Sequence, residues 1–133
     1  MKYLLINFLF FFSVSISNAG NYYEDAIKKF ESKDFKSSIL FLEKSIVSDP
    51  KDSKSWILLG KSYALIENNE TALKYYEIAF TLKPESAELN LLLGKITYEL
   101  NLLDKYDTYL DNLKIICPSG CSELTQLQKI KIN

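Results

Sequence analysis

The three prolines of the chain recur at a fixed interval of 34 residues, and this interval constrains the fold more than any other feature. They are Pro50, Pro84 and Pro118. Within each interval, apolar residues recur three and four positions apart in two stretches, and a polar turn such as "ESKDF", "IENNE" or "ELNLLDK" separates the stretches. That spacing is typical of helices, and a proline ends the second helix because it lacks a backbone donor. The sequence therefore predicts repeated pairs of helices and no strand.

The segment "SKSWILLGKSYALIENNETALKYYEIAFTLKPES" carries the most regular copy of the repeat. Its landmark residues stand at the spacing of a known pattern: Trp56, Leu59, Gly60, Tyr63, Ala72, Tyr76, Ala79 and Pro84. This pattern resembles the tetratricopeptide repeat, with Tyr76 where phenylalanine is usual. The resemblance implies antiparallel helix pairs that stack into a superhelix.

The segments on either side keep the same phase but match the pattern less closely. The predicted division of the folded part is three repeats and a capping segment, at residues 20–52, 53–86, 87–120 and 121–133. Gly94 recurs one interval after Gly60, which predicts that a neighbouring helix passes too close for a side chain at both places. Tyr106 stands where a small residue is usual, so we expect it to push the two helices of the third repeat apart.

The predicted fold class is therefore all-α, a right-handed superhelical solenoid of antiparallel helix pairs. We expect six paired helices and a seventh from about Ser122, which places Leu124, Leu127 and Ile130 on one apolar stripe. That last helix is typical of a solubilising cap, because terminal repeats need a polar outer face. Ser53 and Ser86 are the expected N-caps of the helices that follow the first two prolines.

The first residues read "MKYLLINFLFFFSVSISNAG": a lysine, a short apolar run, and the small residues Ser17 and Ala19 ahead of Gly20. This order is typical of a secretory signal peptide, and we expect residues 1–19 to be removed. A retained transmembrane anchor is the alternative, but the run is short for a span. We expect a periplasmic or secreted protein without membrane contact after removal. A lysine-only, Asn- and Ile-rich composition favours a bacterial source, although a eukaryotic secretory leader is similar.

The only two cysteines, Cys117 and Cys121, flank the predicted turn before the last helix. Two cysteines without a histidine supply only half of the four ligands that a structural metal site needs. Their spacing is also one residue longer than that of a thioredoxin-like redox pair. Pro118 and Gly120 allow a tight turn, and an even cysteine count in an exported chain favours a disulfide. We expect a structural bridge worth about 2 kcal/mol.

The composition excludes several classes of function. The chain has no histidine, so the commonest general base and zinc ligand are missing. Its 16 basic residues, all lysine, face 17 acidic ones, which leaves no basic footprint for nucleic acid. No phosphate-binding loop or metal-spaced cluster is present. We expect no enzymatic activity, no cofactor, no metal and no small-molecule substrate.

The resemblance implies a protein or peptide partner, held in a concave groove lined by the first helix of each pair. The positions that should face this groove are Tyr23, Ile27, Phe30, Ile57, Lys61, Ala64, Leu91, Lys95 and Tyr98. Lys61 and Lys95 share one phase, so we expect them side by side in a mildly basic, apolar trough. Such a trough suits an extended segment with an acidic side chain or a carboxylate terminus. Alternatively, the lysines are simply solvated and the tyrosines cover the core.

Two other roles are alternatives to groove binding. A structural scaffold of an envelope complex would use the convex face or the helix edges instead. A clamp for the C-terminal carboxylate of heat-shock chaperones would need lysine, asparagine or arginine at groove positions that here hold Tyr23, Ile27, Leu58, Glu88 and Leu92. None of these side chains is a suitable donor, so we do not expect that role.

Overall fold

The computed structural model describes residues 21–130, and this part of the chain consists of seven helices without a strand. The helices are α1 (Tyr22–Glu31), α2 (Phe35–Ser48), α3 (Ser53–Leu65), α4 (Asn69–Leu82), α5 (Ala87–Glu99), α6 (Leu103–Ile116) and α7 (Ser122–Ile130). The predicted all-α fold and the seventh helix are confirmed. None of these helices combines the length and apolar character that a membrane span requires. The predicted signal peptide, residues 1–19, lies outside the described residues.

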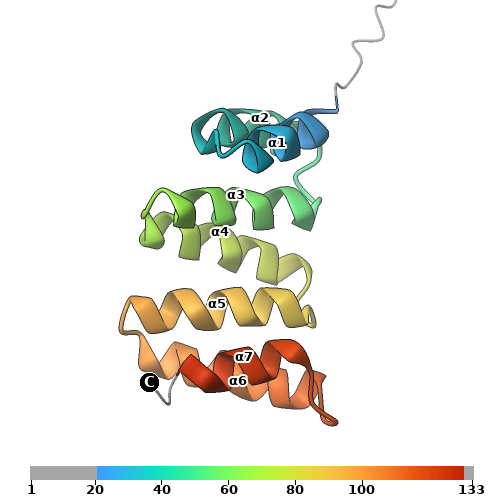
Figure 1. The fold of residues 1–133 in the computed structure, drawn as a ribbon. Coiled ribbons are helices and arrows are strands. Elements are labelled where there is room, and N and C mark those ends of the chain that lie inside the picture. The colour runs from blue at the N-terminus through green and yellow to red at the C-terminus, as the bar shows by residue number, and fades with distance from the viewer. Residues whose placement is uncertain (1–20, 131–133) are drawn as a thin grey trace, which may run out of the picture.

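The helices stack as pairs in the order of the sequence (Figure 1). Each helix packs chiefly on its neighbours along the chain, and α7 packs on both α5 and α6. Contacts between distant repeats are therefore not needed to hold the stack. This is the arrangement of a solenoid, in which each unit is stabilised by the next one.

The turn inside each helix pair has the same backbone conformation in all three repeats. Lys33, Glu67 and Asn101 have φ values of 62°, 61° and 57°, and they are spaced at the 34-residue interval. In the first two turns the next residue, Asp34 or Asn68, caps the following helix through its side chain. A left-handed residue reverses the chain in few residues, which sets each pair antiparallel.

A second recurring contact fixes the first helix of the later repeats. The indole N–H of Trp56 donates to the Pro50 carbonyl at 2.8 Å, and the Asn90 side-chain amide donates to the Pro84 carbonyl at 2.9 Å. Both donors stand six residues after their proline. The prolines thus do more than end helices, because their carbonyls also anchor the helix that follows.

The N-cap expected at Ser53 is wrong by one residue. Asp52 is the N-cap of α3, and its carboxylate accepts from the backbone N–H groups of Lys54 and Ser55. The same carboxylate also accepts from the Ser55 hydroxyl at 2.7 Å, so Asp52 makes three hydrogen bonds at the start of α3. Ser86 is the N-cap of α5, as predicted.

Three clusters of buried side chains follow one another along the stack. The first joins α1, α2 and α3 around Ala26, Leu42 and Leu59. The second joins α4, α5 and α6 around buried residues that include Ala72, Tyr76, Leu89 and Leu93. The third joins α5, α6 and α7 around Leu91, Tyr106, Leu110, Leu113, Leu124 and Leu127.

The outer side of α1 is polar where later repeats are apolar. Asp25 shares the phase of Leu59 and Leu93, both of which are buried against the preceding repeat. Lys28 lies one turn further along α1 and forms an exposed ion pair with Asp25 at 3.3 Å. This side of the first repeat therefore suits solvent rather than another helix pair.

The two helical glycines face different neighbours. A Cβ on Gly60 would lie 2.5 Å from two ring carbons of Tyr76, in α4 of the same pair. A Cβ on Gly94 would instead lie 2.5 and 2.7 Å from the methyl carbons of Leu127 in α7. Close helix approach at both glycines is confirmed. In the third repeat, however, the buried ring of Tyr106 lies between α5 and α6, and the close approach is made by α7.

We predict that Gly60→Ala lowers the free energy of unfolding by about 1–3 kcal/mol, since the ring of buried Tyr76 cannot move aside. This is the net loss, because the steric cost of the added methyl group exceeds the roughly 1 kcal/mol by which alanine is favoured over glycine within a helix. Gly94→Ala should cost less, because the ends of the Leu127 side chain can shift with α7. Denaturant unfolding of both variants measures the difference, and an equal or larger loss for Gly94→Ala would contradict the assignment.

Candidate functional site

A small pocket lies where the first helices of the three repeats meet. Its volume is about 100 Å³, and its lining comes from α1, α3 and α5: Tyr23, Lys54, Ile57, Leu58, Lys61 and Glu88. The structure thus brings together Tyr23, Ile57 and Lys61, three of the predicted groove residues. They come from two different repeats, so the pocket exists only in the stacked solenoid.

The charges at this pocket are partly neutralised. The ammonium group of Lys61 forms an ion pair with the carboxylate of Glu88, which stands at the start of α5. Lys54 adds an exposed lysine at the other end of the lining. An incoming carboxylate would therefore meet Lys54 directly, and would have to compete with Glu88 for Lys61.

Tyr23 supplies a neutral hydrogen-bonding group to the same pocket. Burial raises the pKa of the Tyr23 phenol, and the nearby carboxylates of Asp52 and Glu88 raise it further. A raised phenol pKa keeps the hydroxyl protonated at and above neutral pH. The side chain is thus an apolar ring with a hydroxyl donor at its tip.

The third repeat does not offer an open groove, which corrects part of the prediction. Leu91 is only 7% exposed, because it packs in one cluster with Leu124 and Leu127 of α7. Tyr98 packs against the ring of Tyr106, with 5.4 Å between ring centroids. Leu91 thus belongs to the core under the capping helix, and half-buried Tyr98 packs against that core.

The two predicted groove lysines have separate partners. Lys95 donates to the side-chain oxygen of Gln126 in α7 at 3.4 Å, whereas Lys61 is paired with Glu88. The two lysines therefore do not form one basic trough. Lys61 is neutralised by Glu88, and Lys95 lies beside the capping helix.

The remaining predicted groove residues belong to the first and second repeats. Ile27 and Ala64 are half-buried, and Ala64 packs against the second core cluster. The Phe30 ring packs edge-on against Phe35 across the turn between α1 and α2, with 5.4 Å between centroids. None of these three side chains is in the lining of the pocket.

Comparison with known proteins bears on the fold. No family model matches the chain. The PEX5-related protein of Mus musculus is 30% identical over 72 residues, which covers 54% of this chain and 13% of that protein. Its Homo sapiens counterpart is also 30% identical over 72 residues, 12% of its length. The chain thus spans only a small part of these curated relatives.

Two solved structures share the architecture over most of the chain. The first TPR of Spaghetti (RPAP3), bound to the HSP90 peptide SRMEEVD, has a TM-score of 0.74 at 16% identity and covers 83% of this chain and 87% of that one. The chain has the tetratricopeptide-repeat fold. The Yersinia enterocolitica type III secretion chaperone SycD, in complex with a peptide of the translocator YopD, has a TM-score of 0.71 at 13% identity, covering 83% and 92%.

One pocket residue of this tetratricopeptide-repeat fold, Lys54, was missed as a groove position, and Leu58 and Glu88 were named only as groove positions unsuited to a chaperone clamp. Lys54 and Glu88 share one phase, at the second residue of α3 and of α5. The periodicity thus carried a signal for this pair. The cross-repeat contact of Glu88 with Lys61 had no such signal, because it depends on how far α5 is displaced from α3.

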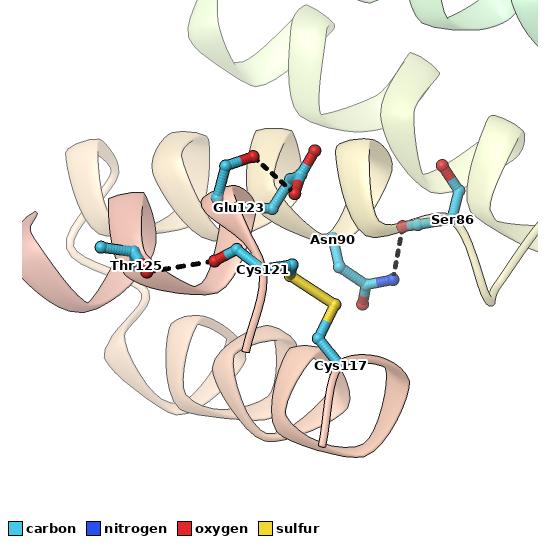
Figure 2. Close-up of a disulfide and its surroundings, with 7 residues drawn as sticks. Ser86, Asn90, Cys117, Cys121, Glu123 and Thr125 are labelled. Atoms are coloured by element: carbon cyan, nitrogen blue, oxygen red, sulfur yellow. Dashed lines mark hydrogen bonds between the residues drawn. A yellow bond between two sulfur atoms is a disulfide. The ribbon is translucent and has the colours of Figure 1, made fainter. Parts of the chain in front are cut away.

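The disulfide lies at the opposite end of the solenoid from α1 and α2. It joins Cys117 at the end of α6 to Cys121 just before α7, with 5.7 Å between their Cα atoms (Figure 2). Gly120 has a φ of 88°, and its N–H donates to the Cys117 carbonyl at 2.8 Å, which closes the turn. Among the described residues, no group of three or more histidine, cysteine or acidic side chains is placed to hold a metal ion.

We predict that replacing both cysteines by serine lowers the free energy of unfolding by about 2 kcal/mol, because the unfolded chain loses a small closed loop. Denaturant unfolding of the variant measures this loss. Reduced wild-type protein should match it, since both lack the bridge. Equal stability of the oxidised and reduced wild type would show that the bridge contributes nothing to folding.

Proposed function

We propose that the chain is a non-enzymatic protein–protein interaction module of the bacterial periplasm, which holds a peptide or a partner helix in the concave groove of its repeats. The observation that carries this proposal is the pocket shared by α1, α3 and α5, with Tyr23, Ile57 and Lys61 in its lining. Peptide complexes of two proteins with this fold, RPAP3 and SycD, support it by analogy. The absence of histidine supports a role without catalysis.

The pocket favours one class of ligand. Its volume of about 100 Å³ admits one apolar side chain of moderate size, and Ile57 and Leu58 provide apolar walls for it. The Tyr23 hydroxyl and the Lys54 ammonium group flank these walls. The best fit is an extended segment with an apolar anchor residue beside an acidic residue or a carboxylate terminus.

The location is part of the proposal and rests on the first residues alone. If residues 1–19 act as a signal peptide, the exported protein begins at Gly20. N-terminal sequencing of protein recovered from the periplasmic fraction should then start with Gly-Asn-Tyr-Tyr. An intact Met1 in the membrane fraction would instead identify a retained anchor.

A structural scaffold is the second candidate, and one observation favours it. Ile115 on α6 is 77% exposed and borders a hollow of about 290 Å³ with Phe80, Pro84 and Ile116. This hollow lies between α4 and α6, the second helices of their pairs. A permanent partner on that side would bury apolar surface outside the groove.

A pull-down from envelope extract, with chemical crosslinking, separates the two candidates. The groove variant is Lys54→Glu/Lys61→Glu, which should reduce recovery of an acidic partner at least about tenfold through charge repulsion. The matched control is Lys105→Glu/Lys114→Glu on α6, which makes the same charge change and also removes one ion pair between repeats, Lys105 with Glu77.

Loss of a partner by the groove variant and its retention by the control would support groove binding. Loss by the control alone would move the interface to α6 and support the scaffold. Thermal unfolding of both variants, followed by circular dichroism, ensures that each compared protein is folded.

A further inference from the structure

The outward side of α2 carries an apolar ridge that the repeat does not require. Leu40 is 53% exposed and Val47 is 86% exposed, and they lie two turns apart on one face of the helix. One interval later, the same two phases hold Lys74 and Thr81. Because the second repeat folds with polar residues there, the ridge of the first repeat needs an explanation other than folding.

Opposite charges flank this ridge at the same level of the helix. Lys44 lies on the α1 side, with its ammonium group 5.8 Å from the centre of the Tyr22 ring. Glu43 lies on the α3 side: burial raises the pKa of the Tyr63 phenol in α3, and the nearby charge of Glu43 adds to that rise. Successive helical residues point about 100° apart, so the two side chains fall on opposite flanks of Leu40 and Val47.

Ridge and flanks together border an open hollow of about 370 Å³. Its lining is Tyr22, Leu40, Glu43, Lys44, Val47 and Ser48. These residues belong to α1 and α2 alone. The surface is therefore complete within the first repeat, and it is separate from the pocket that lies between the first helices of the three repeats.

We infer that this ridge is a self-association surface, on which α2 packs parallel to α2 of a second copy about a two-fold axis running along the helices. A half-turn about that axis exchanges the two flanks and keeps each residue at its level. Leu40 and Val47 then meet their own counterparts, and Glu43 of each copy faces Lys44 of the other. The surface is thus complementary to itself in both apolar contact and charge.

The charge pattern favours a second copy of the chain as the partner, and it favours parallel over antiparallel packing of the two α2 helices. An antiparallel pairing on the same ridge would place Glu43 opposite Glu43 of the second copy, and Lys44 opposite Lys44. In the third repeat the phase of Val47 holds exposed Ile115, but its flanks are Asp111 and Asn112, which offer no opposite charges. Only the first repeat has the self-complementary pattern.

One helix face is smaller than a standard interface of about 800 Å² per partner, so the dimer is concentration-dependent. The test uses the chain from residue 20 onward, which contains every described helix. Sedimentation equilibrium over about 10 µM to about 1 mM should show the wild-type mass rising from monomer to dimer. A wild type that stays monomeric over this range would overturn the inference.

Charge reversal tests the pairing itself. Glu43→Lys and Lys44→Glu should each weaken dimerisation at least about tenfold, because like charges then face each other twice. The double variant Glu43→Lys/Lys44→Glu should restore the wild-type constant. An equimolar mixture of the two single variants should form a heterodimer, since one copy then presents two lysines and the other two glutamates.

The apolar contact has its own matched pair of variants. Val47→Asp should abolish dimerisation, whereas Ile115→Asp, at the same phase of the third repeat, should leave it unchanged. Single reversals that dimerise like the wild type, or a double variant that does not recover, would overturn the parallel pairing. Because Val47 and both charged residues are exposed, circular dichroism melts should show all variants folded.

Discussion

The solenoid depends on one leucine that each unit inserts into the unit before it. Leu59, Leu93 and Leu127 stand at successive 34-residue intervals, and all three are almost completely buried. Leu59 completes the cluster of the first pair, Leu93 that of the second and Leu127 that of the third. No pair buries its apolar face alone, so removing any unit would expose the core of its neighbour. The short α7 is therefore as necessary to the third pair as a full repeat would be.

The 34-residue periodicity made the fold predictable, because each interval in the sequence corresponds to one helix pair in the stack. Local chemistry was less predictable where two groups compete for one role, as Asp52 and Ser53 do at the start of α3. Asn90 shows a further limit: it stands in the phase of Trp56 and shares its bond to a proline carbonyl, although the two side chains look unrelated in the sequence.

The groove was predictable only as far as the repeats are alike. Ile57 and Lys61 line a pocket because α5 follows α3 at the regular spacing, and Glu88 then reaches Lys61. Leu91 and Tyr98 have the same phases as groove residues, yet they belong to the core. They pack with the buried ring of Tyr106 and with Leu127 in one cluster beneath α7, and the Tyr106 hydroxyl donates to the Leu127 carbonyl, which ties α6 to α7 there. Because α7 covers these side chains, the open groove does not continue along the third repeat.

The disulfide lies at a turn, and each of the two earlier turns of this kind has a side-chain hydrogen bond to a proline carbonyl. Leu124 stands six residues after Pro118, where Trp56 and Asn90 supply donors to their prolines, and a leucine has none. The Cys117–Cys121 bridge spans this same turn. Attachment of the last helix therefore depends on the redox state of its surroundings, unlike attachment of the helices before it. In a reducing compartment α7 is held by packing and by hydrogen bonds such as that of the Tyr106 hydroxyl to the Leu127 carbonyl, and in an oxidising one it is also tethered covalently. The last helix therefore gains its covalent tether only after oxidation.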